Sequence, residues 1–109
     1  MTEYTSLDVS RRLAEAGFKA EERHLVKMVE DGRGGAADIW GYRTDTLMEW
    51  LAERGMITYL AKSSKGFHVA YALTGVWLWT ANADAKTIPD SLGEVVLAVL
   101  AKEAEHDQG

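Results

Sequence analysis

The chain has no cysteine, a single proline and no long apolar run among its 109 residues. Without cysteine it can form no disulfide, no thiolate nucleophile and no iron–sulfur cluster, and a zinc site would need histidine and carboxylate ligands alone. No stretch approaches the roughly 20 apolar residues that cross a bilayer. The N-terminal segment carries Glu3 and Asp8 and lacks the apolar centre of a signal peptide. We therefore expect a cytoplasmic protein with no membrane segment.

Basic residues are also scarce, because 12 Lys and Arg stand against 17 Asp and Glu, a net charge of −5. This balance disfavours direct nucleic-acid binding, which depends on clustered cations. It either favours a basic protein partner, including one that normally holds nucleic acid, or serves only to keep the protein in solution. The apolar share of 47% is ordinary, so we expect one globular domain over residues 1–109 with a frayed polar tail at residues 104–109.

Three segments carry apolar residues at helical spacing. The first follows Thr5 and Ser6, either of which can cap a helix. The second covers residues 44–54, with Leu and Trp side chains on one face. The third has the broadest apolar face, and its start is marked by the capping-box spacing of Thr87 and Asp90.

Five segments show the alternation that is typical of strands, namely residues 24–30, 37–42, 56–62, 67–73 and 76–80. In the third of these, simple alternation places Ile57 and Tyr59 on one face and Met56 and Leu60 on the other. Residues 82–86 are expected to form a loop. Strands grouped between helices favour an α+β fold over a parallel α/β fold. We expect one antiparallel sheet of about five strands with three helices, mainly against one face, in the order α-β-β-α-β-β-β-α.

Four segments of the chain, taken in order, resemble a widespread group of small phage and prophage proteins. These segments are Ser6–Phe18, Asp45–Leu51, Phe67–Tyr71 and Asp90–Leu92, whereas residues 19–43 depart from the group's pattern. Most members of the group have no assigned function. The resemblance implies a phage or prophage origin and action in the cytoplasm of a bacterial host cell. Small phage proteins often inhibit host defence, as anti-CRISPR proteins do, and the resemblance carries no catalytic residue.

No group of residues has the spacing of a catalytic or metal site. His24, His68 and His106 each lack a second ligand placed on the same helical face. The adjacent Glu21 and Glu22 diverge in either regular structure, so they do not form an acid–base pair. We therefore expect no catalytic residue, no metal and no cofactor.

Two loops offer an alternative function. The Gly-rich run of residues 32–35 and the Ser/Lys turn of residues 63–66 are each able to cradle an anion through backbone and hydroxyl groups. Neither has the spacing of a dinucleotide or Walker motif. A small-ligand or nucleotide-binding module is therefore the second functional hypothesis.

Aromatic residues on the predicted strands are the candidate partner-binding residues, and they are Trp40, Tyr42, Trp77 and Trp79. Trp77 and Trp79 share one face of a strand whose other face is also apolar, so they either complete the core or lie in an interface. The first functional hypothesis is thus a non-catalytic interaction protein that binds a host or phage protein. A homodimer through the strand face is a further form of that hypothesis.

Overall fold

The computed structural model describes residues 4–20, 24–30, 36–73 and 80–107. Within these ranges it contains three helices and five strands in the order that the sequence predicts. The elements are α1 (Leu7–Glu15), β1 (His24–Glu30), β2 (Ala36–Gly41), α2 (Thr44–Ala52), β3 (Gly55–Ser63), β4 (Gly66–Leu73), β5 (Thr80–Ala85) and α3 (Ile88–Asp107). The prediction of an α+β fold is therefore confirmed.

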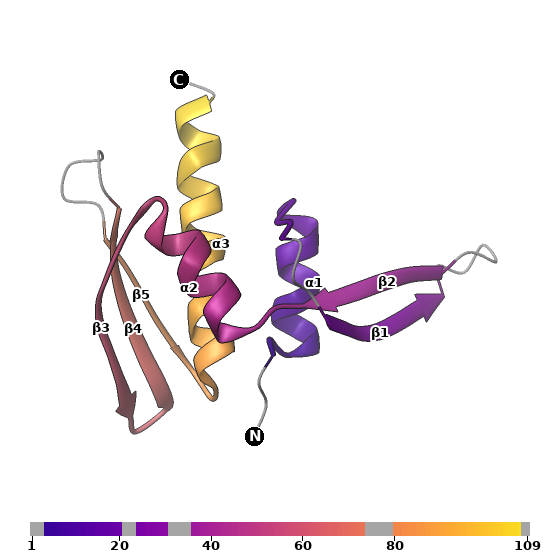
Figure 1. Cartoon of the computed structure of the whole chain (residues 1–109), viewed down its shortest axis with the longest axis horizontal. Helices are drawn as coiled ribbons and strands as arrows, with labels where there is room; N and C mark the ends of the chain where they lie inside the picture. The colour runs from indigo at the N-terminus through magenta and orange to yellow at the C-terminus, as the bar shows by residue number, and fades with distance from the viewer. Residues whose placement is uncertain (1–3, 21–23, 31–35, 74–79, 108–109) are drawn as a thin grey trace.

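The strands form two antiparallel sheets, so the prediction of one five-stranded sheet is wrong. One sheet is the β1–β2 hairpin, and the other has the order β3-β4-β5. Figure 1 shows α1 and α3 between the hairpin and the three-stranded sheet. The hairpin does not pair with the three-stranded sheet, and the chain after β2 binds the segment just before α1. Thr5 N–H donates to the carbonyl of Tyr42 at 3.0 Å, and Tyr42 N–H donates to the Thr5 hydroxyl at 3.1 Å.

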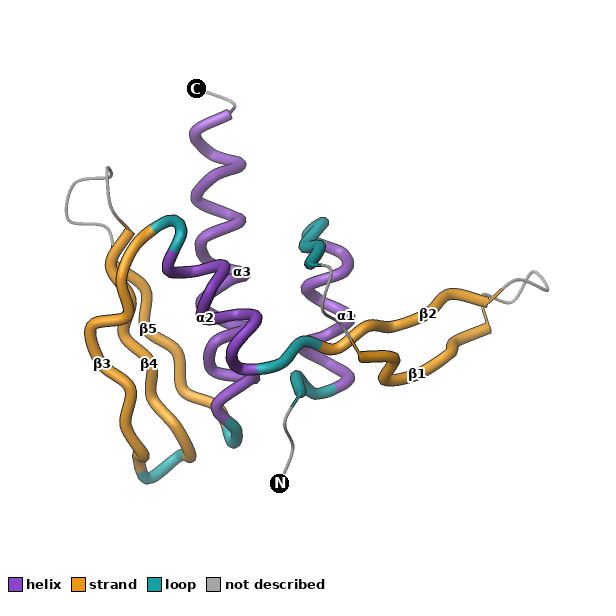
Figure 2. Tube along the Cα trace, in the orientation of Figure 1, coloured by secondary structure: helices purple, strands orange, loops and turns teal. Residues whose placement is uncertain are grey.

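Helices cover one face of the three-stranded sheet. Helix α3 packs against β4 and β5, and α2 packs against β3 and against α3. Helix α1 lies on the other side of α3, where it also contacts β2, as Figure 2 shows. All described helices therefore lie on the same side of this sheet, in agreement with the expected arrangement.

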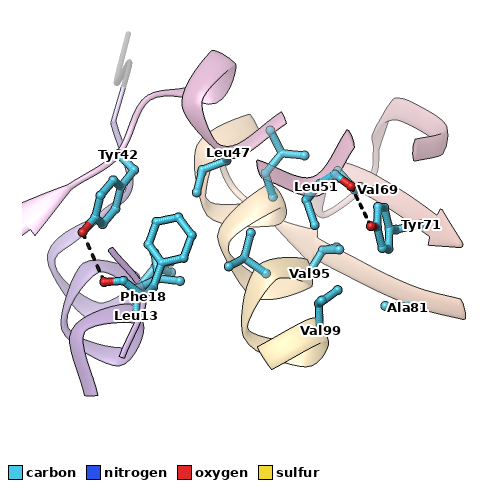
Figure 3. Close-up of a cluster of buried hydrophobic side chains, with 13 residues drawn as sticks. Leu13, Phe18, Tyr42, Leu47, Leu51, Val69, Tyr71, Ala81, Val95 and Val99 are labelled. Atoms are coloured by element: carbon cyan, nitrogen blue, oxygen red, sulfur yellow. Dashed lines mark hydrogen bonds between the residues drawn. The ribbon is translucent and has the colours of Figure 1, made fainter. Parts of the chain in front are cut away.

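A single cluster of buried apolar side chains joins these layers (Figure 3). Its members come from α1, the segment after α1, the end of β2, α2, β4, β5 and α3. They are Val9, Leu13, Phe18, Tyr42, Leu47, Leu51, Val69, Tyr71, Ala81, Leu92, Val95, Val96 and Val99. Helix α3 contacts α1, α2 and the sheet, which explains why its apolar face is the broadest of the three.

The helix starts agree with the sequence in part. Ser6 is the N-cap of α1, and the Thr87 hydroxyl accepts the N–H of Asp90 at 3.3 Å, as expected of a cap. The carboxylate of Asp90 does not complete a capping box, because it accepts the N–H of Ser6 at 2.6 Å and so joins the starts of α1 and α3. Helix α2 has Arg43 at its N-cap, and the Arg43 side chain makes no capping hydrogen bond.

The last strand and the last helix differ from the prediction. Residues 82–85, expected in a loop, belong to β5 because they pair with β4 from Ala70 to Phe67. Residues 76–79 of the expected strand lie outside the described residues. Helix α3 extends through residues 104–107 of the expected tail. Over the described residues, no helix is both long and apolar enough to cross a membrane.

Candidate partner-binding surface

The predicted aromatic residues do not form one described surface. Tyr42 is only 4% exposed, and its ring meets Phe18 edge-on with 4.6 Å between centroids, so its side chain is part of the core. Trp40 is half-buried on β2 and packs against the core. Trp77 and Trp79 lie outside the described residues.

Exposed apolar side chains gather instead on β3, at an edge of the three-stranded sheet. Among the described residues, the large apolar side chains that reach solvent are Met48, Met56, Tyr59 and Leu60. Met56 and Tyr59 are the most exposed, at 60% and 56%. Met48 lies on α2, and the other three lie on β3. Strand β3 and its neighbours in the sheet are therefore the candidate binding surface.

A bulge in β3 brings Met56 and Tyr59 onto the same face. Met56 pairs with Ala72 and Tyr59 with Ala70, while the register skips Thr58. Residues directly opposite each other in an antiparallel sheet share a face, and an extra residue shifts the alternation by one position. The prediction that Tyr59 shares a face with Ile57 is therefore wrong, because Ile57 pairs with the buried Tyr71.

We call the face that bears Met56 and Tyr59 the outer face, since the described helices lie on the opposite side of the sheet. Its remaining residues pair in turn across β4 and β5. The outer face consists of Met56, Tyr59, Ala61, Ser63, Gly66, His68, Ala70, Ala72, Thr80, Asn82 and Asp84. On this face the central strand β4 carries the small residues Ala70 and Ala72, so the larger side chains of Met56 and Tyr59 project beyond their neighbours.

A polar cluster occupies the outer face near the β3–β4 turn. The Nδ1 atom of His68 lies 3.1 Å from Oδ1 of Asp84, and the Ser63 hydroxyl donates to the same oxygen at 3.4 Å. The ring of Tyr59 lies beside the imidazole, with 5.9 Å between centroids. Sequence reasoning missed this cluster, because it depends on the β4–β5 register and on Asp84 belonging to a strand.

The polar cluster does not have the geometry of a hydrolytic triad. In such a triad the imidazole bridges the serine and the carboxylate and takes the proton from the hydroxyl. Here Ser63 and His68 both bind Asp84, so the hydroxyl is directed to a carboxylate and not to a base. The Ser63 oxygen also accepts the N–H of Lys65 at 3.2 Å. The cluster is therefore a hydrogen-bonded part of the sheet surface.

The alternative ligand sites receive little support from this geometry. An anion at the turn of residues 63–66 would meet the carboxylate of Asp84, which disfavours its binding. The loop of residues 32–35 lies outside the described residues. No group of three or more His, Cys, Asp or Glu side chains that could hold a metal ion occurs in the described part of the chain.

The outer face is thus the surface on which exposed apolar, aromatic and polar side chains meet in one place. A sheet that is covered on one side normally presents polar residues on the other. The outer face departs from that pattern at Met56 and Tyr59. No protein-family model, curated protein or solved structure gives a significant match to the chain.

Proposed function

We propose that this protein is a non-catalytic interaction protein that binds another protein through the outer face of its three-stranded sheet. The observation that carries the proposal is the exposure of Met56 and Tyr59, at 60% and 56%, on one sheet face. Burying a large apolar side chain contributes roughly 1.5–3 kcal/mol, so a partner that covers both gains substantial free energy. Tyrosine is also enriched among residues that dominate interface energies.

The polar residues of the same face support binding over catalysis. His68, Asp84 and Ser63 are partly exposed on an open sheet, and both His68 and Ser63 bind Oδ1 of Asp84. Catalytic groups instead need a water-excluding site in which a base faces a nucleophile. Hydrogen-bonding groups beside an apolar patch are the usual composition of an interface and its rim.

The proposed partner is a host or phage protein in a bacterial cell, and a component of a bacterial defence system is the candidate that the resemblance to small phage proteins favours. On this proposal the chain acts as an inhibitor, as anti-CRISPR proteins do. Expression of the chain in cells with an active CRISPR system is expected to raise the transformation efficiency of a targeted plasmid. The Met56→Ser/Tyr59→Ser variant is expected to lose that effect. An unchanged efficiency with the original chain would contradict this choice of partner.

Site-specific cross-linking tests the binding surface even while the partner is unidentified. A photo-reactive phenylalanine analogue at Tyr59 is expected to cross-link to one discrete protein in the host cell. The matched control carries the same analogue at Met48, an exposed apolar position on α2. If the analogue at Met48 captures the same protein as efficiently as the analogue at Tyr59, the outer face is not the binding surface.

A further inference from the structure

We infer that the free edge of β3 pairs with β3 of a second copy of the chain, in antiparallel orientation, and so joins two three-stranded sheets into one. The inference goes beyond the proposed function and does not rest on it, because the contact runs along the edge of the sheet and not over its outer face. A two-fold axis perpendicular to the sheet relates the copies, so both outer faces stay open on the same side of the joined sheet.

Strand β3 is an edge strand with unpaired backbone groups. Within the described part of the chain it has one strand neighbour, β4, and it forms the left border of the sheet in Figure 2. In an antiparallel pair, alternate N–H and C=O groups of each strand point away from the neighbour. On β3 these groups make no backbone hydrogen bond to any other described element. Such an edge is a template for a further strand.

Apolar side chains are exposed on both sides of β3, which favours an edge contact over a contact on the outer face alone. Met56 and Tyr59 lie on the outer face. Leu60 pairs with the buried Val69 and so lies on the helix-covered side, yet it is 38% exposed. A partner that rests on the outer face does not reach Leu60, whereas a strand beside β3 contacts the side chains of both faces.

The opposite edge of the sheet does not have these properties. Strand β5 has six residues, against nine in β3, and its sequence Thr80-Ala-Asn-Ala-Asp-Ala85 holds no large apolar side chain. It also places the carboxylate of Asp84 on the outer face. Short strands and charged side chains are usual means by which proteins prevent edge pairing, so β3 is the edge available for it.

The chain itself supplies the strand that this edge requires. The occupant has to be extended and has to carry apolar side chains on both faces, and β3 is such a strand. Its one charged residue, Lys62, lies near its end. Antiparallel pairing about the middle of the strand therefore places each lysine opposite an uncharged residue of the other copy, so that no like charges oppose each other.

The bulge at Thr58 limits the regular part of β3 to residues 59–63, where the register with β4 is unbroken. Opposite residues of an antiparallel pair share a face, so one residue lies opposite its own copy at the two-fold axis. A centre at Lys62 would oppose two like charges, and one at Ser63 would lie at the end of the strand. So short a pairing is a small contact, and we expect a reversible dimer in the range of transient complexes. The candidate centres are Tyr59, Leu60 and Ala61.

Single cysteines test the pairing directly, because the chain has no cysteine of its own. Opposite Cα atoms in an antiparallel pair lie about 4.5–5.5 Å apart, within the range of a disulfide, whereas copies of a residue one position from the centre lie beyond that range. Among Tyr59→Cys, Leu60→Cys and Ala61→Cys, one variant is expected to form a disulfide-linked dimer at least tenfold faster than the other two under mild oxidation. The matched control is Asn82→Cys, an exposed position on β5, which should stay monomeric.

Light scattering over a range of concentrations measures the association without a cross-link. The apparent mass of the original chain is expected to rise from 12.0 kDa toward twice that value. Leu60→Asp introduces a charge at the pairing edge and should move the rise to at least tenfold higher concentration. Asn82→Asp adds the same charge on β5 and should behave as the original chain does.

These measurements need no second protein, and they therefore test the inference separately from the proposed function. A chain that stays at 12.0 kDa at every concentration overturns the inference and leaves the outer face as a surface for another protein. Equal cross-linking of the three β3 variants, no cross-linking of any, or equal cross-linking of Asn82→Cys also overturns it. One preferred β3 position, together with weaker association of Leu60→Asp, supports it.

Discussion

Gly93 lies where α3 packs closely against α1. A Cβ there would lie 2.5 Å from Cγ1 of Val9 and 3.4 Å from Cγ2 of Thr5. We expect Gly93→Ala to lower the free energy of unfolding by up to about 2 kcal/mol, because overpacking costs about 1–3 kcal/mol and the gain in helix propensity returns roughly 1 kcal/mol. Urea denaturation measures the change.

A double-mutant cycle with Val9→Ala isolates the Gly93 contact. Removing the Val9 methyl groups makes room for the new Cβ, so the double variant should lose less stability than the sum of the two single changes. Simple additivity would show that the contact with Val9 does not cause the loss.

Tyr71 carries a buried hydroxyl that links two elements, since it donates from β4 to the carbonyl of Leu51 on α2 at 2.7 Å. Tyr71→Phe keeps the ring and leaves that carbonyl without this donor. We expect a loss of about 0.5–1.5 kcal/mol in the free energy of unfolding, the net contribution of one hydrogen bond, because the carbonyl still accepts the N–H of Arg54 at 3.0 Å. Thermal or urea unfolding of the two proteins at neutral pH gives the difference. A stability equal to that of the original chain would show that the bond contributes nothing.

The same tyrosine gives stability a pH dependence at the alkaline end. Burial raises the pKa of Tyr71 above its ordinary value of 10.0, while the charge of Arg54 acts in the opposite direction. The folded state thus keeps the proton where the unfolded chain has lost it, so stability is fully present below about pH 10 and falls as pH rises toward the folded pKa. Urea midpoints should fall more steeply above about pH 10 in the original chain than in Tyr71→Phe.

Asp90 joins two elements by accepting the Ser6 N–H at the start of α1 while it lies in the first turn of α3. We expect Asp90→Ala to cost about 1–2 kcal/mol, because the N–H loses its acceptor and both helix starts lose a favourable negative charge. Asp90→Asn is the control, since it keeps an acceptor of the same shape and should retain most of the stability. Equal losses in the two variants would assign the effect to charge rather than to the hydrogen bond.

The order of the elements was predictable, and their pairing was not. Periodicity identifies the three helices and β1 to β4, and apolar residues of the helices and of β2 to β4 lie in or against one core. Strand β5 has the sequence Thr80-Ala-Asn-Ala-Asp-Ala85, whose residue types are mostly depleted in strands, and it is held by pairing with β4. The division into two sheets depends on the contacts of the Thr5 and Tyr42 backbone, which no local pattern encodes.

The candidate surface also depends on contacts between distant residues, which local sequence patterns do not predict. The sequence marks aromatic strand residues as partner-binding candidates, but burial of Tyr42 depends on Phe18, which is distant along the chain. Simple alternation places Tyr59 on the wrong face because a bulge has no reliable sequence signal. The His68–Asp84 contact likewise requires the register between two strands.

At the scale of the whole molecule, the two sheets should differ in local stability. The β1–β2 hairpin projects beyond α1 in Figure 1, whereas the strand β4 is paired on both sides and packs on α3. A two-stranded ribbon is marginal by itself. Hydrogen exchange followed by mass spectrometry is therefore expected to show faster exchange in residues 24–30 and 36–41 than in residues 66–73. Equal protection of both regions would indicate that the chain opens only as one unit.

The skipped position at Thr58 decides which residues of β3 lie on the outer face. If Thr58 paired with Ala70, strict alternation would return, Tyr59 would lie opposite Val69 on the helix-covered side, and Leu60 would lie opposite His68. The composition of β3 would be unchanged, yet its aromatic ring would leave the proposed docking site. Deletion of Thr58 removes the extra residue and keeps Tyr59 opposite Ala70, so a variant without Thr58 should keep Tyr59 on the outer face.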